Sequence, residues 1–197
     1  MAQGYPGHVR EITPEKHDPR QAIRKLARAG YNRGFRVTIH GPNNRYIRDG
    51  QVTRAIAEML GRVGLRASAE TMARNVFFPR AAKEEFSLML AGYSVSYPDP
   101  TLTIQAVLAT PKPGNGTGQA NFGRYSNRTL DDLLARAKRT MEDATREELT
   151  VQSLTSGLKD YGIIPLYIEK NGWATRKPIR ITPDLNGRTQ AMFIQPN

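Results

Sequence analysis

The chain has 197 residues, and its 29 lysines and arginines against 18 aspartates and glutamates give a net charge of +11. It has no run of about 20 apolar residues, which excludes a membrane-spanning helix. It also has no cysteine, which excludes disulfides, thiolate chemistry and cysteine-ligated zinc. The length suits one domain, on the usual scale of about 150 residues. The basic balance favours a polyanionic partner, but the arginines are scattered without interleaved aromatic side chains, so we interpret them mainly as solvated surface.

The first half of the chain alternates strands and helices. Phe35–His40 alternates apolar and polar residues as a half-buried strand does, and apolar residues at helical spacing over Val52–Val63 predict a helix. The elements predicted next are a strand at Leu65–Ala69, a helix at Asn75–Glu85 interrupted early by Pro79, and a strand at Phe86–Leu90. This spacing favours parallel strands, and the fold class is therefore predicted to be α/β.

The second half predicts mainly helices. Pro111–Gly118 is too rich in proline and glycine for regular structure and predicts a surface loop. Ser126 or Asn127 caps a helix whose apolar stripe comprises Leu130, Leu133, Leu134, Ala137 and Met141. The other predicted elements are helices at Thr101–Ala109 and Ala144–Lys159, a strand at Ile163–Ile168 with Pro165 at an edge or entry position, and a tail of turns and short extended pieces over Trp173–Asn197.

Residue patterns typical of enzymes are absent from the sequence. The three histidines, His8, His17 and His40, do not have metal-ligand spacing, and Gly114–Gly118 lacks the lysine of a phosphate-binding loop. The adjacent acids Glu84 and Glu85 would point in different directions on a helix and are expected to be solvated. We therefore expect no catalysis, no metal and no cofactor.

Several short motifs, in order along nearly the whole chain, resemble the C-terminal part of the family 5 extracellular solute-binding proteins, the periplasmic peptide and oligopeptide receptors of ABC importers. Each motif is weak alone, and the assignment depends on their order and spacing. The motifs are His17-Asp18-Pro19, Leu26 to Tyr31, Gly34-Phe35, Pro42 to Tyr46, Leu60 to Gly64, Gly92-Tyr93 in place of a usual Gly-Trp, Asn121 to Asn127, and Ile164 to Tyr167.

The resemblance implies a single lobe of a type II periplasmic-binding-protein-like fold, with a mixed sheet and flanking helices. It divides the chain into a basic entry segment with one helix (1–34), a ligand-binding lobe (35–172), and a C-terminal segment (173–197) that in the family crosses back to the first lobe. Since the motifs match neither that first lobe nor a signal peptide, we expect the chain to be a fragment. We expect the last segment either to fold onto its own lobe or to pair with another copy, because open strand edges promote association.

In the family the solute lies between the lobes, held by loops at strand ends. The matching loops here are 43–46, 93–99 and 119–125, and the candidate ligand-binding residues on them are Asn44, Arg45, Tyr46, Tyr93, Ser94, Ser96, Asn121 and Phe122. Tyr93 offers an aromatic wall, the serines offer short polar groups, and Arg45 suits a carboxylate. The alternatives are that Tyr93 belongs to the core, that Arg45 is a solvated turn residue, and that Asn44 only forms the turn.

Two departures from the family bear on the solute. Peptide receptors commonly have an aspartate at Ser96, and dipeptide receptors an arginine at about Gly41, and neither charge is present. The expected solute is therefore a peptide or a related small polar molecule, such as a modified peptide, an opine or an oligosaccharide, delivered to an ABC importer permease. The alternatives are a basic adaptor for an anionic polymer or surface and a non-functional gene remnant. The family resemblance implies a periplasmic location, whereas the chain as it stands, without an export signal at its start, is expected to stay cytoplasmic.

Overall fold

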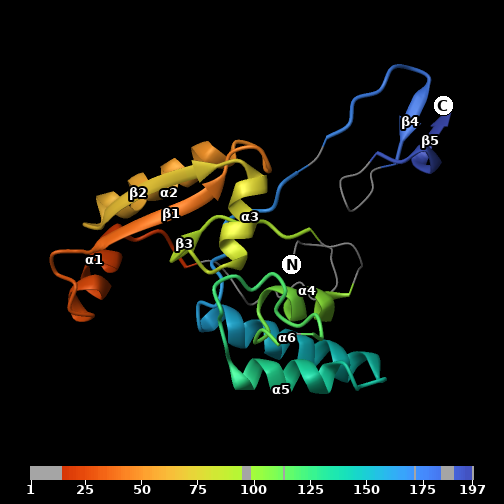
Figure 1. Ribbon diagram of the computed structural model, residues 1–197. Coiled ribbons are helices and arrows are strands. Elements are labelled where there is room, and N and C mark those ends of the chain that lie inside the picture. Colours follow the sequence, from red (N-terminus) through yellow and green to blue (C-terminus); the bar gives the residue numbers. More distant parts are fainter. Residues whose placement is uncertain (1–14, 95–98, 113, 171, 183–188, 197) are drawn as a thin grey trace. The chain divides into compact units, whose positions relative to one another are not determined.

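The computed structural model of the protein describes residues 15–94, 99–112, 114–170, 172–182 and 189–196 (Figure 1). These residues fall into two compact units. One consists of residues 15–92 and 106–127, and the other of residues 93–105 and those from 128 onward. None of the described helices is long and apolar enough to cross a membrane.

A parallel sheet forms the centre of the first unit. Its strands are β1 (Arg36–Pro42), β2 (Arg66–Met72) and β3 (Leu88–Met89), in the order β2-β1-β3. Arg36 of β1 lies opposite Arg66 of β2, and Ile39 lies opposite Leu88 of β3. All pairs are parallel, so the prediction of an α/β fold with parallel strand-helix-strand units is confirmed.

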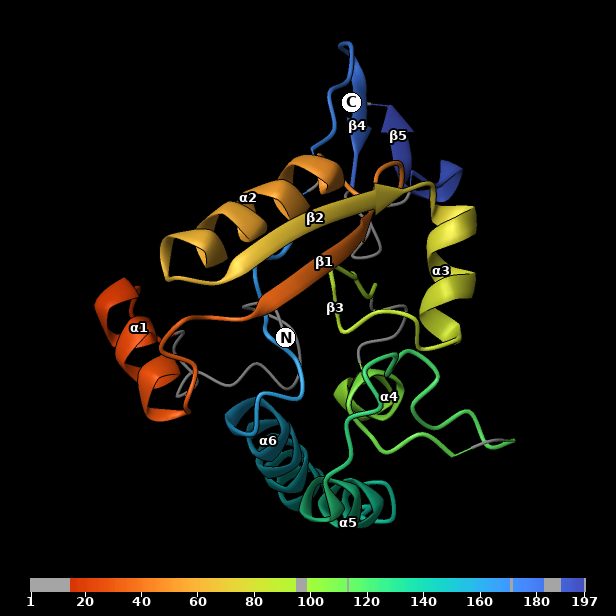
Figure 2. The ribbon, with the colours of Figure 1, turned by 60° about the vertical axis from the view of Figure 1, so that its left-hand side comes forward.

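One face of the sheet is covered by helix α2 (Asp49–Arg62), which connects β1 to β2 (Figure 2). The helix buries Thr53 and Ala57, and Thr53 is completely inaccessible to solvent. Thr53 lies so close to β1 that a β-carbon on Gly41 would stand 2.2 Å from its Oγ1 atom. The missing side chain at Gly41 therefore allows α2 to approach the strand.

An aromatic cluster packs beside the sheet around α3 (Arg74–Ala82). Phe77 and Ala81 of this helix are fully buried, and Phe86 stacks on Phe77 with ring centres 5.3 Å apart. Met72, Phe78, Met89 and Phe122 complete the cluster. The remaining helix of this unit, α1 (Pro19–Arg28), begins at Asp18, whose Oδ1 accepts the amide of Gln21 at 2.8 Å.

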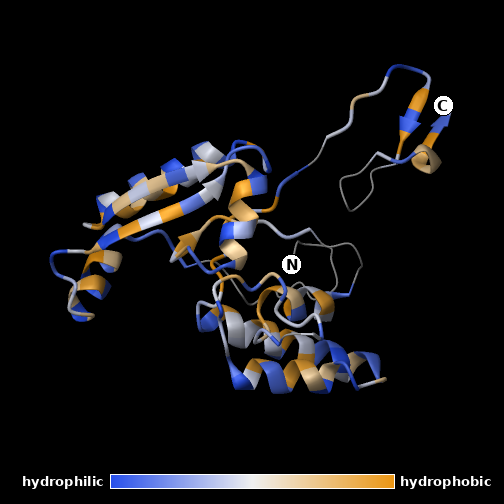
Figure 3. Cartoon of the chain, in the orientation of Figure 1, coloured by the Kyte–Doolittle hydropathy of each residue, from blue (hydrophilic) through white to orange (hydrophobic). Residues whose placement is uncertain are grey.

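The second unit is mainly helical. Helix α5 (Arg128–Ala137) packs on α6 (Asp143–Lys159), and Ser153 donates its hydroxyl to the Leu130 carbonyl oxygen at 3.1 Å. Figure 3 shows hydrophobic and hydrophilic residues alternating along α5, as expected of a helix with one buried face. The remaining elements are α4 (Pro100–Val107), which divides between the units at Gln105, the 3-10 helix η1 (Ala191–Phe193), and the antiparallel pair β4 (Ile179–Ile181) and β5 (Ile194–Pro196).

Three details of the sequence-based prediction are wrong. The predicted strand at Ile163–Ile168 has no regular structure and is exposed, because a strand forms only where its backbone groups find a partner edge, and no described strand pairs with it. Met141 is 90% exposed, since α5 ends at Ala137, before the apolar stripe reaches it. Pro79 does not interrupt α3, which continues to Ala82.

Candidate functional site

The loop that leaves β1 is held in place by a buried carboxylate. Asp49, at the start of α2, is only 3% exposed. Its Oδ2 accepts the amides of Arg45 and Tyr46 at 2.8 and 2.9 Å, and its Oδ1 accepts the amide of Gly50 at 2.8 Å. Thr53 donates its hydroxyl to the Asp49 carbonyl oxygen at 2.9 Å, which fixes the first turn of the helix. Sequence reasoning missed Asp49, although an acid in a first helical turn is the signal that marks it.

The hydroxyl of Tyr46 ties this loop to the chain that follows β3. It donates to the Gly92 carbonyl oxygen at 3.0 Å and accepts from the Gly92 amide at 2.8 Å. The ring lies close to the backbone, and a β-carbon on Gly92 would stand 2.8 Å from the Tyr46 Cε1 atom. The predicted site residue Tyr46 therefore joins two of the strand-end loops.

Asn44 ties the same loop to the segment that follows β2. Its Oδ1 accepts the amide of Arg74 at 2.8 Å, and the Asn43 amide donates to the Met72 carbonyl oxygen at 2.9 Å. The loops after all three strands of the sheet are thus connected to one another at its carboxyl edge, which is where open α/β sheets place their ligands.

Arg45 is the charged member of the predicted set, and it is exposed. Its guanidinium lies over the ring of Tyr46, 5.1 Å from the ring centre, in the geometry of a cation–π contact. Among the described residues, no carboxylate forms an ion pair with Arg45. This side chain is therefore held in position and remains available to an anion.

Tyr93 and Ser94, on the chain after β3, are exposed, Tyr93 by 46%. The alternative that Tyr93 belongs to the core is therefore wrong. Ser96 lies outside the described residues. Contact of these residues with a solute stays a prediction.

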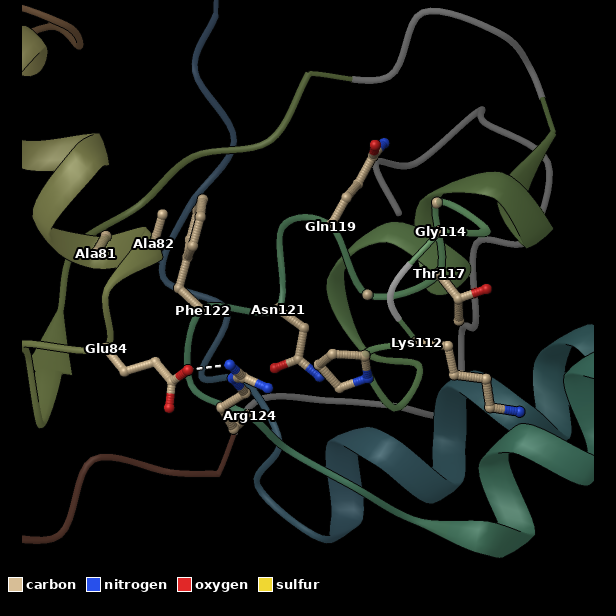
Figure 4. A pocket seen from close by; sticks show the side chains of 13 residues that line it. Ala81, Ala82, Glu84, Lys112, Gly114, Thr117, Gln119, Asn121, Phe122 and Arg124 are labelled. Carbon is tan, nitrogen blue, oxygen red and sulfur yellow. Dashed lines mark hydrogen bonds and ion pairs between the residues drawn. The ribbon is translucent and has the colours of Figure 1, made fainter.

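Asn121 and Phe122 lie at a separate place in the first unit, beside an open hollow of about 320 Å³ (Figure 4). Asn121 is 6% exposed, and its side-chain amide forms hydrogen bonds with the backbone of the surrounding loop. Its Nδ2 donates to the carbonyl oxygens of Ala109 and Tyr125 at 3.0 and 2.8 Å, while its Oδ1 accepts the Tyr125 amide at 3.0 Å. Phe122 packs toward Phe78, with ring centres 6.2 Å apart. These contacts show Asn121 and Phe122 shaping the loop, and their contact with a solute stays a prediction.

An ion pair between Arg124 and Glu84 crosses the same hollow (Figure 4). Both residues have left-handed backbone conformations, with φ of 54° and 62°. Sequence reasoning expected Glu84 to be solvated, but it pairs with Arg124 from a distant part of the chain, and sequence spacing cannot show such a pair.

Another polar cluster of the first unit lies on the face of β1 opposite α2, where His40, Glu70, Arg80 and Glu85 contact one another in a row. His40 is 9% exposed, stacks on Phe86 with ring centres 4.2 Å apart, and places its Nε2 atom 3.4 Å from Glu70. Arg80 pairs with Glu85 at 2.7 Å and with Glu70 at 3.3 Å. The hydrogen bond to Glu85 raises the pKa of Arg80 above its ordinary value. Within the described part of the chain, no three histidines or acids gather as a metal site would need.

Comparison with known proteins agrees with this architecture. The family model "Bacterial extracellular solute-binding proteins, family 5 Middle" matches residues 1–115. The glutathione-binding protein GsiB of Escherichia coli K12 is 25% identical over 171 residues, which are 83% of this chain and 32% of GsiB.

Two solved structures share the fold. HbpA2 from Haemophilus parasuis superimposes with a TM-score of 0.77 at 19% identity over 97% of this chain and 38% of HbpA2. The periplasmic binding protein DppA from Helicobacter pylori, solved with the peptide STSA, gives a TM-score of 0.70 at 24% identity over 82% of this chain and 31% of DppA. The chain spans about a third of the length of these relatives. Because the family model covers more than half of the chain and its fold is that of the periplasmic binding proteins, the chain belongs to family 5 of the bacterial extracellular solute-binding proteins.

Proposed function

We propose that the chain is a solute-capturing lobe of the substrate-binding component of an ABC importer, and that its solute is a peptide or a related small polar molecule. The observation that carries the proposal is the connection of the three strand-end loops through Asn44 and Tyr46, because it builds one ordered edge at the place where this fold class binds ligands. The proteins that this chain is similar to include a glutathione-binding protein and a periplasmic binding protein solved with a bound peptide.

The proposed solute contacts at this edge are Arg45 and the ring of Tyr46, both in the first unit. Tyr93 and Ser94 follow Gly92 directly in the chain, belong to the other unit and are proposed separately as solute contacts. Arg45 supplies two parallel N–H donors for a carboxylate, and the exposed Tyr93 supplies an apolar wall with a polar tip. The action is binding without chemistry. The partner in transport is the importer's permease, and the place of action is the periplasm, both by extension from the family.

One lobe contacts only one side of a solute, so we expect weak binding, with a dissociation constant of roughly 1 mM or about −4 kcal/mol. The test is a titration of the chain with a neutral tripeptide such as Ala-Gln-Ala, followed by NMR. Tyr46→Phe keeps the ring but removes both hydrogen bonds to Gly92, and it is expected to weaken binding by about fivefold.

The control is Tyr31→Phe, which makes the same chemical change at an exposed tyrosine that precedes the sheet and lies outside the strand-end loops. This variant is expected to bind as the wild type does. Equal weakening by both substitutions, or no saturable binding of any small polar solute, would contradict the proposal.

A second candidate function, binding of an anionic polymer, is favoured by the net charge of +11 alone. Strong retention on heparin that falls steeply with salt would support it, because binding to a polyanion releases counterions. Self-association through the C-terminal segment 173–197 also stays a prediction, and native mass spectrometry tests it.

A further inference from the structure

Four arginines lie on the loops and in the first two helical turns at the carboxyl edge of the sheet. Arg45 and Arg48 belong to the loop between β1 and α2, Arg54 to α2, and Arg74 begins α3. All four are exposed. Arg54 extends back toward the loop, and its Nη1 atom lies 3.7 Å from where a β-carbon on Gly50 would stand. The charge of Arg54 therefore lies over the start of α2, beside the loop that carries Arg45.

Within the described part of the chain, no carboxylate forms an ion pair with any of the four guanidiniums. Asp49 is the acid in the same stretch, and it is buried with its two oxygens occupied by three backbone amides. The acids of this unit that pair with arginines pair with others: Asp18 with Arg24, Glu70 and Glu85 with Arg80, and Glu84 with Arg124.

Arg45 is the best positioned of the four. Its backbone amide is fixed by Asp49, and its guanidinium lies over a ring that is itself anchored to Gly92 by two hydrogen bonds. A side chain that is already ordered loses less conformational entropy when it binds, so more of the interaction energy appears as affinity. Arg45 is therefore suited to discriminate between solutes by charge.

We propose that this edge selects solutes of net negative charge, with Arg45 as the specificity contact and Arg48, Arg54 and Arg74 as the source of a positive field. The inference rests on the proposed function, because it assumes that solute is captured at this edge. A carboxylate gains a charge-assisted bond with Arg45, while a cationic solute meets four like charges. For ligands that differ by one charge we expect about a tenfold difference in affinity at low salt.

The test uses the full chain and two matched ligand sets, followed by NMR titration at low and at high salt. The first set is Ala-Glu-Ala, Ala-Gln-Ala and Ala-Lys-Ala; the first two are nearly equal in shape and differ by one charge, and the third carries a positive central side chain. The second is succinate and its neutral analogue succinamide. The variants are Arg45→Gln and Arg28→Gln, since Arg28 is an exposed arginine at the end of α1 and its substitution changes the net charge equally.

The expected result is that Ala-Glu-Ala binds most tightly and Ala-Lys-Ala most weakly, and that salt narrows the difference. Arg45→Gln is expected to reduce the preference severalfold, and Arg28→Gln to leave it unchanged. Equal affinities for the three peptides, or an equal loss of preference in both variants, would overturn the inference while leaving the proposed function intact. If no peptide binds, succinate decides the inference: binding of succinate but not of succinamide, weakened only by Arg45→Gln, supports capture of small anions at this edge, and any other outcome overturns the inference. If none of these ligands binds, the proposed function fails as well.

Discussion

The contact between Gly41 and Thr53 makes the packing of α2 on the sheet directly testable. In Gly41→Ala the new methyl group would stand 2.2 Å from the Thr53 Oγ1 atom and 3.2 Å from its Cγ2 atom, whereas ordinary contacts lie at 3.4–4 Å. The helix must therefore move away from β1 by more than an ångström, or the strand must shift by as much. Thr53 is completely buried, and its hydroxyl is hydrogen-bonded to the Asp49 carbonyl oxygen, so it has no free space to move into.

Overpacking of this kind costs about 1–3 kcal/mol, and we expect Gly41→Ala to be near the upper end because both contacting groups are buried. Thr53→Ala removes the two closest atoms and leaves only Cβ, at 3.3 Å, so the double variant Gly41→Ala/Thr53→Ala is expected to recover more than half of the loss. Urea denaturation followed by circular dichroism measures the four free energies of unfolding and hence the coupling energy of the pair. Additive effects of the two substitutions, or a Gly41→Ala variant as stable as the wild type, would refute this packing.

Three further predictions follow from the core, the loops and a helix cap. Phe77→Ala is expected to lower the free energy of unfolding by about 3–5 kcal/mol, and Phe77→Leu by clearly less, because Phe77 is fully buried; denaturation of both variants measures this, and equal losses would count against the cluster. Tyr46→Phe is expected to cost about 1–2 kcal/mol through its two hydrogen bonds to Gly92, and hydrogen exchange should become faster at the Gly92 amide in particular. The Thr145 hydroxyl and the amides of Thr145 and Ala144 lower the pKa of Glu142, which caps the start of α6. The carboxylate's contribution to stability is therefore present above the ordinary glutamate pKa of about 4.3 and is lost as the pH falls through the lowered pKa. Glu142→Gln should make the free energy of unfolding fall less steeply at acid pH, and an unchanged pH dependence would contradict the role of Glu142 as a cap.

The sequence predicted the architecture well where a local pattern determines the structure. Alternation along Phe35–His40 and helical spacing over Val52–Val63 correspond to β1 and α2, although each element is shifted by one to three residues at its ends. Parallel pairing followed from strand-helix-strand order alone. The prediction was wrong at Ile163–Ile168, where the apolar alternation is typical of a strand but a strand also needs a partner edge, which local sequence does not show.

The candidate site was predictable only in part. The loop containing Asn44, Arg45 and Tyr46 was located from its place after a strand, but the buried Asp49 that orders it became evident only from three hydrogen bonds. Asn121 illustrates the opposite case, since an asparagine on a loop suggests a ligand contact, whereas its amide bonds to the backbone of its own unit. The position of Asp49 in a first helical turn is a signal that the sequence does contain. The bonds that occupy the Asn121 amide depend on how the loop folds back on itself, which residue type alone does not show.

The most direct test of solute capture at the strand ends is a map of backbone amide shifts during titration of the full chain with Ala-Glu-Ala, carried beyond the expected dissociation constant of roughly 1 mM. We predict saturable shifts concentrated at residues 44–50, at Arg74 and at residues 91–94, with little change along α5 and α6. Shifts spread over α5 and α6, or none at saturating peptide, would contradict capture at this edge.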